Sequence, residues 1–134
     1  MNKFKFSMPQ ESPMPRQAKI QEGWYPYRII DIKISNNCLA RSGVRDRVSF
    51  VFELTIEGQV VPFTQSLYFS ESPNSPYVRF MMMLCECYQT SDINQEMLIG
   101  TQGTLYLIHV SDQNGNVFEN IYDLHPDLDQ PEVL

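Results

Sequence analysis

The sequence predicts an all-β domain with one helix, on the evidence of three patterns. Apolar and polar residues alternate in several stretches, as they do in half-buried strands. Hairpin turn sequences separate two pairs of these stretches, at Glu57-Gly58 and at residues 112–116. Residues 76–89 instead have apolar residues at helical spacing. With 134 residues and 43% hydrophobic content, the chain is long enough to bury one core.

The first strand is expected over residues 24–34. In its first part Tyr25, Tyr27 and Ile29 have one parity, and from Ile30 onward the apolar residues have the other. Because a β-bulge inserts one extra residue, a bulge near Ile29-Ile30 would turn both sets toward the core. Residues 35–46 are polar and contain several cations, and we expect them to form a loop.

Alternation predicts a second strand over residues 47–56 and a third over residues 59–69. The fourth and fifth strands are expected over residues 104–110 and 117–123. Between the third and fourth strands, Ser75-Pro76 has the sequence of a helix N-terminus, with serine as the cap and proline in the first helical position.

Three strands, a helix and two further strands are the element order of the OB-fold, a five-stranded Greek-key barrel with its helix between strands 3 and 4. Another small β-barrel or sandwich with one helix is the alternative. The OB-fold-like domain is expected over residues 21–123. Residues 1–20 are expected to form a flexible N-terminal arm, and residues 124–134 an acidic, disordered C-terminal tail.

Charge is distributed unevenly along the chain. The first 47 residues contain nine of the ten bases and four acids, which gives 9 − 4 = +5. The remaining 87 residues contain one base and twelve acids, which gives 1 − 12 = −11. This asymmetry indicates a polyanionic partner for the basic part and a solubilising or partner-recruiting role for the acidic part.

Single-stranded nucleic acids are held by cations that contact the phosphates and by aromatic faces on which the bases stack. We expect the cations in and beside the first predicted loop to contact phosphates; these are Lys33, Arg41, Arg45 and Arg47. Two aromatic residues are candidates for stacking. They are Trp24, at the start of the first strand, and Tyr68, which is opposite in parity to the apolar residues of the third strand.

Four short segments carry a family resemblance: Glu22-Gly23-Trp24-Tyr25, residues 48–54, the Ser75-Pro76 turn, and residues 98–104. Together they resemble small OB-fold single-stranded DNA-binding proteins of bacteriophages and integrative conjugative elements, over residues 20–123. The resemblance implies a non-enzymatic, DNA-binding protein of the bacterial cytoplasm. The chain differs from the housekeeping bacterial single-stranded DNA-binding proteins, because it has no long glycine- and glutamine-rich linker and does not end in Pro-Phe.

The sequence offers little for other chemistries. With two histidines, His109 and His125, it contains no recognisable nucleophile–base arrangement, so we expect no catalytic residues. Cys85 and Cys87 would point about 200° apart on a helix, which excludes a shared metal ion. We expect no cofactor, because no glycine-rich phosphate loop is present. No segment approaches the length of apolar residues that a membrane span needs.

Two functions remain open. The first is a single-stranded DNA-binding protein of a mobile element or phage, with low sequence specificity, acting in DNA replication or recombination. The alternative is an OB-fold protein–protein interaction module without nucleic-acid affinity. Met81-Met82-Met83 cannot all face the core and could form a contact with a second copy of the chain. The acidic tail could recruit replication or recombination proteins.

Overall fold

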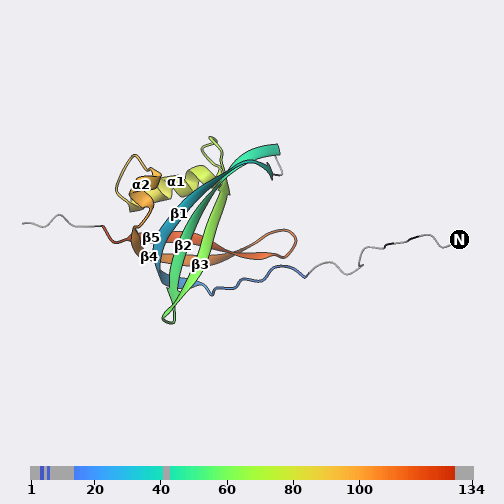
Figure 1. Ribbon diagram of the computed structural model, residues 1–134, viewed down its shortest axis with the longest axis horizontal. Helices are drawn as coiled ribbons and strands as arrows, with labels where there is room; N and C mark the ends of the chain where they lie inside the picture. Colours follow the sequence, from blue (N-terminus) through green and yellow to red (C-terminus); the bar gives the residue numbers. More distant parts are fainter. Residues whose placement is uncertain (1–3, 5, 7–13, 41–42, 129–134) are drawn as a thin grey trace, which may run out of the picture.

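The structure, a computed structural model, describes residues 4, 6, 14–40 and 43–128. Five antiparallel strands form one sheet, and two helices lie next to one another against it (Figure 1). In chain order the elements are β1 (Gly23–Ala40), β2 (Gly43–Ile56), β3 (Gln59–Tyr68), α1 (Pro76–Cys87), α2 (Gln95–Leu98), β4 (Gln102–Ser111) and β5 (Val117–Pro126). The all-β class is confirmed, with α1 between the third and fourth strands as predicted. The short α2 was not predicted, because its four residues are too few to show a helical period.

The order of the strands in the sheet is β3-β2-β1-β4-β5, so β1 is the central strand. Within the described ranges, backbone pairing ends at β3 and β5, and the sheet is not a closed barrel. Its two edges nevertheless meet, since the backbone N–H of Ile121 on β5 donates to Gln65 Oε1 on β3 at 3.1 Å. The sheet is therefore curled, and a side chain bridges its edges where a closed barrel would have a backbone ladder.

The predicted bulge in the first strand is confirmed. The register between β1 and β2 shifts between Ile29 and Asp31. Because of the extra residue, Ile29 and Ile32 are both buried although they have opposite parity, whereas Ile30 between them is exposed. The bulge thus returns Ile32 to the inner face, but Ile34, which was also expected to face the core, is exposed.

The predicted loop over residues 35–46 is wrong. The described part of this segment continues both strands and forms a long β1–β2 hairpin that reaches Ala40 and Gly43. A second register shift follows Ser35, and there Asn37 has a φ of 57° and donates its N–H to the Asp46 carboxylate at 3.1 Å. The hairpin projects beyond the core (Figure 1), so neither of its faces needs to be apolar and no alternation marks it in the sequence.

The core lies between the inner face of the sheet and α1. Phe50, Phe52 and Leu54 of β2 are almost completely buried. Phe80 of α1 packs against Phe50 with the ring centroids 5.0 Å apart.

The start of α1 is confirmed, because the Ser75 hydroxyl accepts a hydrogen bond from the Val78 N–H at 3.2 Å and Pro76 is the first helical residue. The helix therefore presents its apolar face to the core in the register that the sequence predicts.

The segment before β1 is fixed to β5 by one buried carboxylate. The Glu119 side chain is 3% exposed, and it accepts hydrogen bonds from the Arg16 guanidinium at 2.8 Å and from the N–H groups of Lys19 and Ile20, each at 2.9 Å. Residues 16–20, which the sequence assigned to a flexible arm, are thus bound to the edge of the sheet. We call residues 16–20 the N-terminal strap.

The end of β5 also differs from the prediction. The strand continues past Asp123 to Pro126, and its residue Leu124 is buried in the core. The Asp127 N–H donates to the Gln102 carbonyl at 2.8 Å. Residues 124–128 therefore belong to the domain, and the remainder of the predicted tail, residues 129–134, lies outside the described residues. Acidic residues and Pro126 conceal this end of the strand in the sequence.

We expect Gly103→Ala to destabilise the protein, because β5 passes directly over this residue of β4. A Cβ atom at Gly103 would lie 2.3 Å from the His125 carbonyl oxygen and 2.6 Å from the Pro126 Cα. Overpacking of this kind costs about 1–3 kcal/mol. Urea unfolding should show a lower midpoint with an unchanged slope, and an unchanged midpoint would contradict the close approach of the two strands.

Glu119→Gln should reduce stability and remove part of its pH dependence. Burial alone would raise the pKa of Glu119, but the hydrogen bonds from Arg16 and from the backbone outweigh it and hold that pKa below its usual range. A carboxyl group whose pKa is lowered by folding stabilises the folded state at any pH above the usual glutamate pKa of about 4.3. This stabilisation is lost as the pH falls through the pKa of the folded state. We expect the variant to lose about 2 kcal/mol at pH 7.

The measurement is urea unfolding of both proteins at pH 7 and at mildly acidic pH. The difference between wild type and Glu119→Gln should shrink as the pH is lowered. Glu71→Gln, in the exposed segment before α1, is the matched control and should change neither stability nor its pH dependence. An equal difference at every pH would show that the Glu119 carboxylate does not stabilise the strap through its charge.

Candidate nucleic-acid interface

The outer face of β1, β2 and β3 brings together several of the predicted binding residues. Because Phe50 and Phe52 of β2 point inward, the alternate residues of that strand point outward. Strand pairing places the outward residues in two adjacent rows across the three strands: Lys33, Ser49 and Ser66 in one row, and Ser35, Arg47 and Tyr68 in the next. Lys33, Arg47 and Tyr68 are therefore neighbours on one exposed surface, which we call the cationic face.

Tyr68 also holds the β1–β2 hairpin against the end of β3. Its hydroxyl donates to the Leu39 carbonyl at 3.2 Å, and 42% of the residue remains exposed. Next to it, the Phe69 N–H donates to the Asp46 carbonyl at 2.7 Å and extends the contact between hairpin and sheet. The hairpin is thus anchored at the same residue that offers an aromatic surface.

A hollow of about 500 Å³ lies beneath this anchor and contains a third predicted cation. Its lining residues come from the hairpin, from β3 and from the start of α1; they include Ala40, Arg45, Ser66, Tyr68, Ser75 and Pro76. We call it the hairpin hollow. Arg45 and Tyr68 therefore face the same space, which adjoins the cationic face at Tyr68.

Two of the predicted binding residues do not join this group. Arg41 lies outside the described residues. Trp24 is at the opposite end of β1, where that strand pairs with β4, and its ring packs at 4.6 Å from the His125 ring and 5.3 Å from the Tyr106 ring. The His125 Nε2 in turn lies 3.2 Å from the Asp123 carboxylate. The sequence shows that Trp24 can be exposed, but not at which end of the sheet it lies.

The cations of the cationic face are available for a ligand. Among the described residues, ion pairs join Arg16 to Glu119 and His125 to Asp123, both away from this face. Lys33 and Arg47 are exposed, whereas Ser49, which pairs with Lys33, is buried and its hydroxyl is hydrogen-bonded to that of Ser66 at 2.8 Å. The surface thus offers positive charge and one aromatic ring, the two kinds of group that hold a phosphate backbone with stacked bases.

Arg79 is a cationic residue that the sequence analysis did not select. It is exposed on α1 beside the buried Phe80, and it lines a cleft between α1 and the sheet edges. It is the one base after residue 47 in an otherwise acidic part of the chain. The sequence could have indicated this residue, because Arg79 lies just outside the apolar stripe of the predicted helix.

The described residues include no group of three or more histidine, cysteine or acidic side chains that could hold a metal ion. Cys38, Cys85 and Cys87 are all free thiols. Burial raises the pKa of the Cys87 thiol, and the neighbouring Asp123 carboxylate adds to this increase. A raised pKa disfavours the thiolate, so Cys87 is poorly suited to act as a nucleophile.

None of the helices in the described ranges is long and apolar enough to cross a membrane.

Comparisons with known proteins give no match for this chain, whether with family models, with curated proteins or with solved structures.

Proposed function

We propose that this chain is a non-enzymatic protein that binds single-stranded DNA with low sequence specificity, of the kind that phages and mobile elements encode. We further propose that its curled sheet is an OB-type barrel in which the Gln65 side chain, and not a backbone ladder, bridges β3 and β5. The observation that carries the proposal is the grouping of Lys33, Arg47 and Tyr68 on one exposed face, with Arg45 in the adjoining hollow.

The binding mechanism follows from the chemistry of this surface. Lysine and arginine side chains attract the phosphates and release counterions from the strand, which makes binding strong at low salt and weak at high salt. A base stacked on the Tyr68 ring would add about 1–3 kcal/mol with little dependence on sequence. The hydrogen bond from Tyr68 to Leu39 restricts the side chain, so less conformational entropy is lost when a base stacks on its ring.

A protein-interaction module is the second candidate, and one surface favours it. Met82 is exposed on α1 between Met81 and Met83, which are partly buried against the core. Exposed methionine is common on surfaces that adapt to a protein partner. A partner that binds here independently of salt, combined with no affinity for DNA, would favour this function over the first.

Arg45→Ala combined with Arg47→Ala should weaken binding to every single-stranded sequence. Each lost phosphate contact lowers the slope of log K against log salt by about 0.7, so the double variant should lose about 1.4 of the slope. Fluorescence anisotropy of a labelled oligothymidine at several salt concentrations measures both quantities. Lys19→Ala, an exposed cation on the N-terminal strap, is the control for the change in net charge.

The control should keep the salt dependence of the wild type. Equal slopes in the wild type and in the double variant would exclude the hairpin cations as phosphate contacts. A loss in Lys19→Ala of about half that in the double variant, the same loss for each charge removed, would indicate a general charge effect.

Tyr68 is tested by a pair of substitutions that separate its ring from its hydroxyl. Tyr68→Phe loses the hydrogen bond to Leu39 but keeps the ring, and it should retain most of the affinity. Tyr68→Leu loses the ring, and its affinity should fall by the equivalent of one stacked base, about 1–3 kcal/mol. The same anisotropy titration measures both variants. Equal affinities of the leucine and phenylalanine variants would show that no base stacks on this residue.

A further inference from the structure

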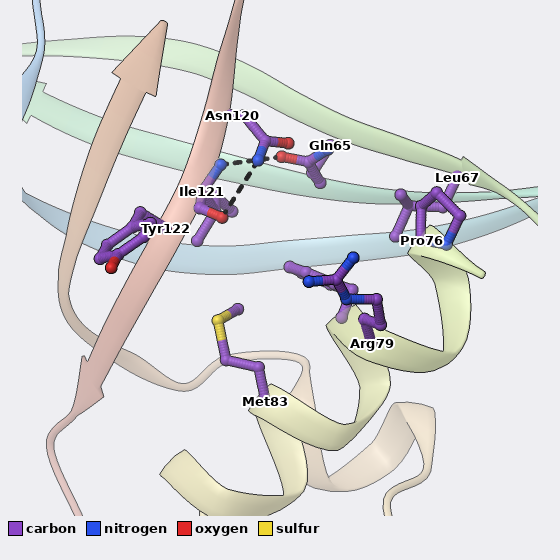
Figure 2. A pocket seen from close by; sticks show the side chains of 9 residues that line it. Gln65, Leu67, Pro76, Arg79, Met83, Asn120, Ile121 and Tyr122 are labelled. Carbon is purple, nitrogen blue, oxygen red and sulfur yellow. Dashed lines mark hydrogen bonds between the residues drawn. The ribbon is translucent and has the colours of Figure 1, made fainter. Parts of the chain in front are cut away.

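A cleft of about 400 Å³ opens between the two free edges of the sheet and α1 (Figure 2). Apolar side chains form part of its walls, namely Leu67, Phe80, Met83 and Ile121. The Arg79 side chain rises from α1 into the space between the helix and the sheet, facing Gln65 and Asn120 on the strands. We call this space the seam cleft.

The polar groups of the seam cleft offer hydrogen-bond donors. Gln65 is only 8% exposed, and its Oε1 is occupied by the Ile121 N–H at 3.1 Å. Its Nε2 group is consequently directed away from Ile121, and no protein acceptor for it lies among the described residues. Arg79 contributes further N–H donors, and the ion pairs within the described ranges do not involve it. Arg79 and the Gln65 Nε2 group therefore favour a ligand with acceptor oxygens and negative charge.

The seam cleft adjoins the hairpin hollow. Leu67 and Pro76 line both spaces, so the two adjoin where the end of β3 meets the start of α1. On one side of this boundary lie Arg45 and Tyr68, and on the other lies Arg79. A chain-like anion that occupies the hollow can thus extend into the cleft without crossing an acidic surface.

We infer that a single DNA strand bound in the hairpin hollow passes over Leu67 and Pro76 into the seam cleft, where Arg79 binds a backbone phosphate. This inference rests on the proposed DNA-binding function and adds to it a further binding residue and a direction for the strand. Phosphate oxygens match the charge and the donors of Arg79, and arginine presents two parallel N–H groups to a phosphate. The apolar walls of the cleft suit the face of the attached base.

The test compares Arg79→Gln with Arg28→Gln in the full chain. Both variants remove one positive charge from an exposed arginine, but Arg28 lines a different hollow, beside Glu53 and Asp127. We expect Arg79→Gln to bind a labelled oligothymidine about tenfold more weakly at low salt, as the loss of one charge-assisted hydrogen-bonded contact implies. Its salt slope should fall by about 0.7, whereas Arg28→Gln should match the wild type.

The length of the strand provides a second readout. Oligothymidines from about 4 to about 16 nucleotides cover the site sizes of single OB-type domains. The shortest strands fill only the hairpin hollow, so they should bind the wild type and Arg79→Gln equally. The difference should appear only when the strand is long enough to reach the cleft. Arg79→Lys keeps the charge and should recover most of the affinity for the long strands.

The outcomes separate this inference from the function on which it rests. If the wild type binds no strand at any length or salt concentration, the DNA-binding function itself is excluded. If the wild type binds and the Arg45 and Arg47 variants weaken it, but Arg79→Gln equals Arg28→Gln at every length, the strand does not enter the seam cleft. Thermal unfolding of each variant confirms that the comparison is made between folded proteins.

Discussion

The structure depends on how its two free sheet edges are satisfied. Backbone N–H and C=O groups along β3 and β5 have no partner strand on one side, and such groups are costly when they are buried without a hydrogen bond. Three parts of the molecule cover or bridge these two edges. The N-terminal strap covers β5 through Glu119, the Gln65 side chain bridges the strands, and α1 packs over the remaining length. The sheet can therefore curl tightly without closing.

The open seam determines where a ligand can bind. A continuous ladder between β3 and β5 would leave no space between the edges, whereas the single bridge at Gln65 leaves the seam cleft beside α1. The β1–β2 hairpin ends above the same region, because Tyr68 fastens it to the end of β3. The cationic face, the hairpin hollow and the seam cleft are thus three parts of one surface that begins on the sheet and ends under the helix.

Features that depend on local sequence could be predicted, and features that depend on distant partners could not. The bulge at Ile29-Ile30, the Glu57-Gly58 turn and the Ser75 cap are all set by neighbouring residues. The N-terminal strap is not, because Arg16 is an ordinary exposed cation until Glu119 is placed beside it. Lys33, Arg47 and Tyr68 were selected from the sequence one by one, and only the pairing of β1, β2 and β3 makes them neighbours. Trp24 was selected as the start of the first strand, and the sequence does not show that this start pairs with β4, away from them.

The N-terminal strap also has a consequence for the order in which the chain folds. Arg16 and Glu119 are separated by 103 residues, so their contact is among the most non-local in the molecule. During synthesis the strap leaves the ribosome before any strand of the sheet, yet its binding surface is completed only when β5 has been made. The earliest part of the domain to be synthesised is therefore among the last to dock. Between the synthesis of β5 and the docking of the strap, the edge of β5 is uncovered.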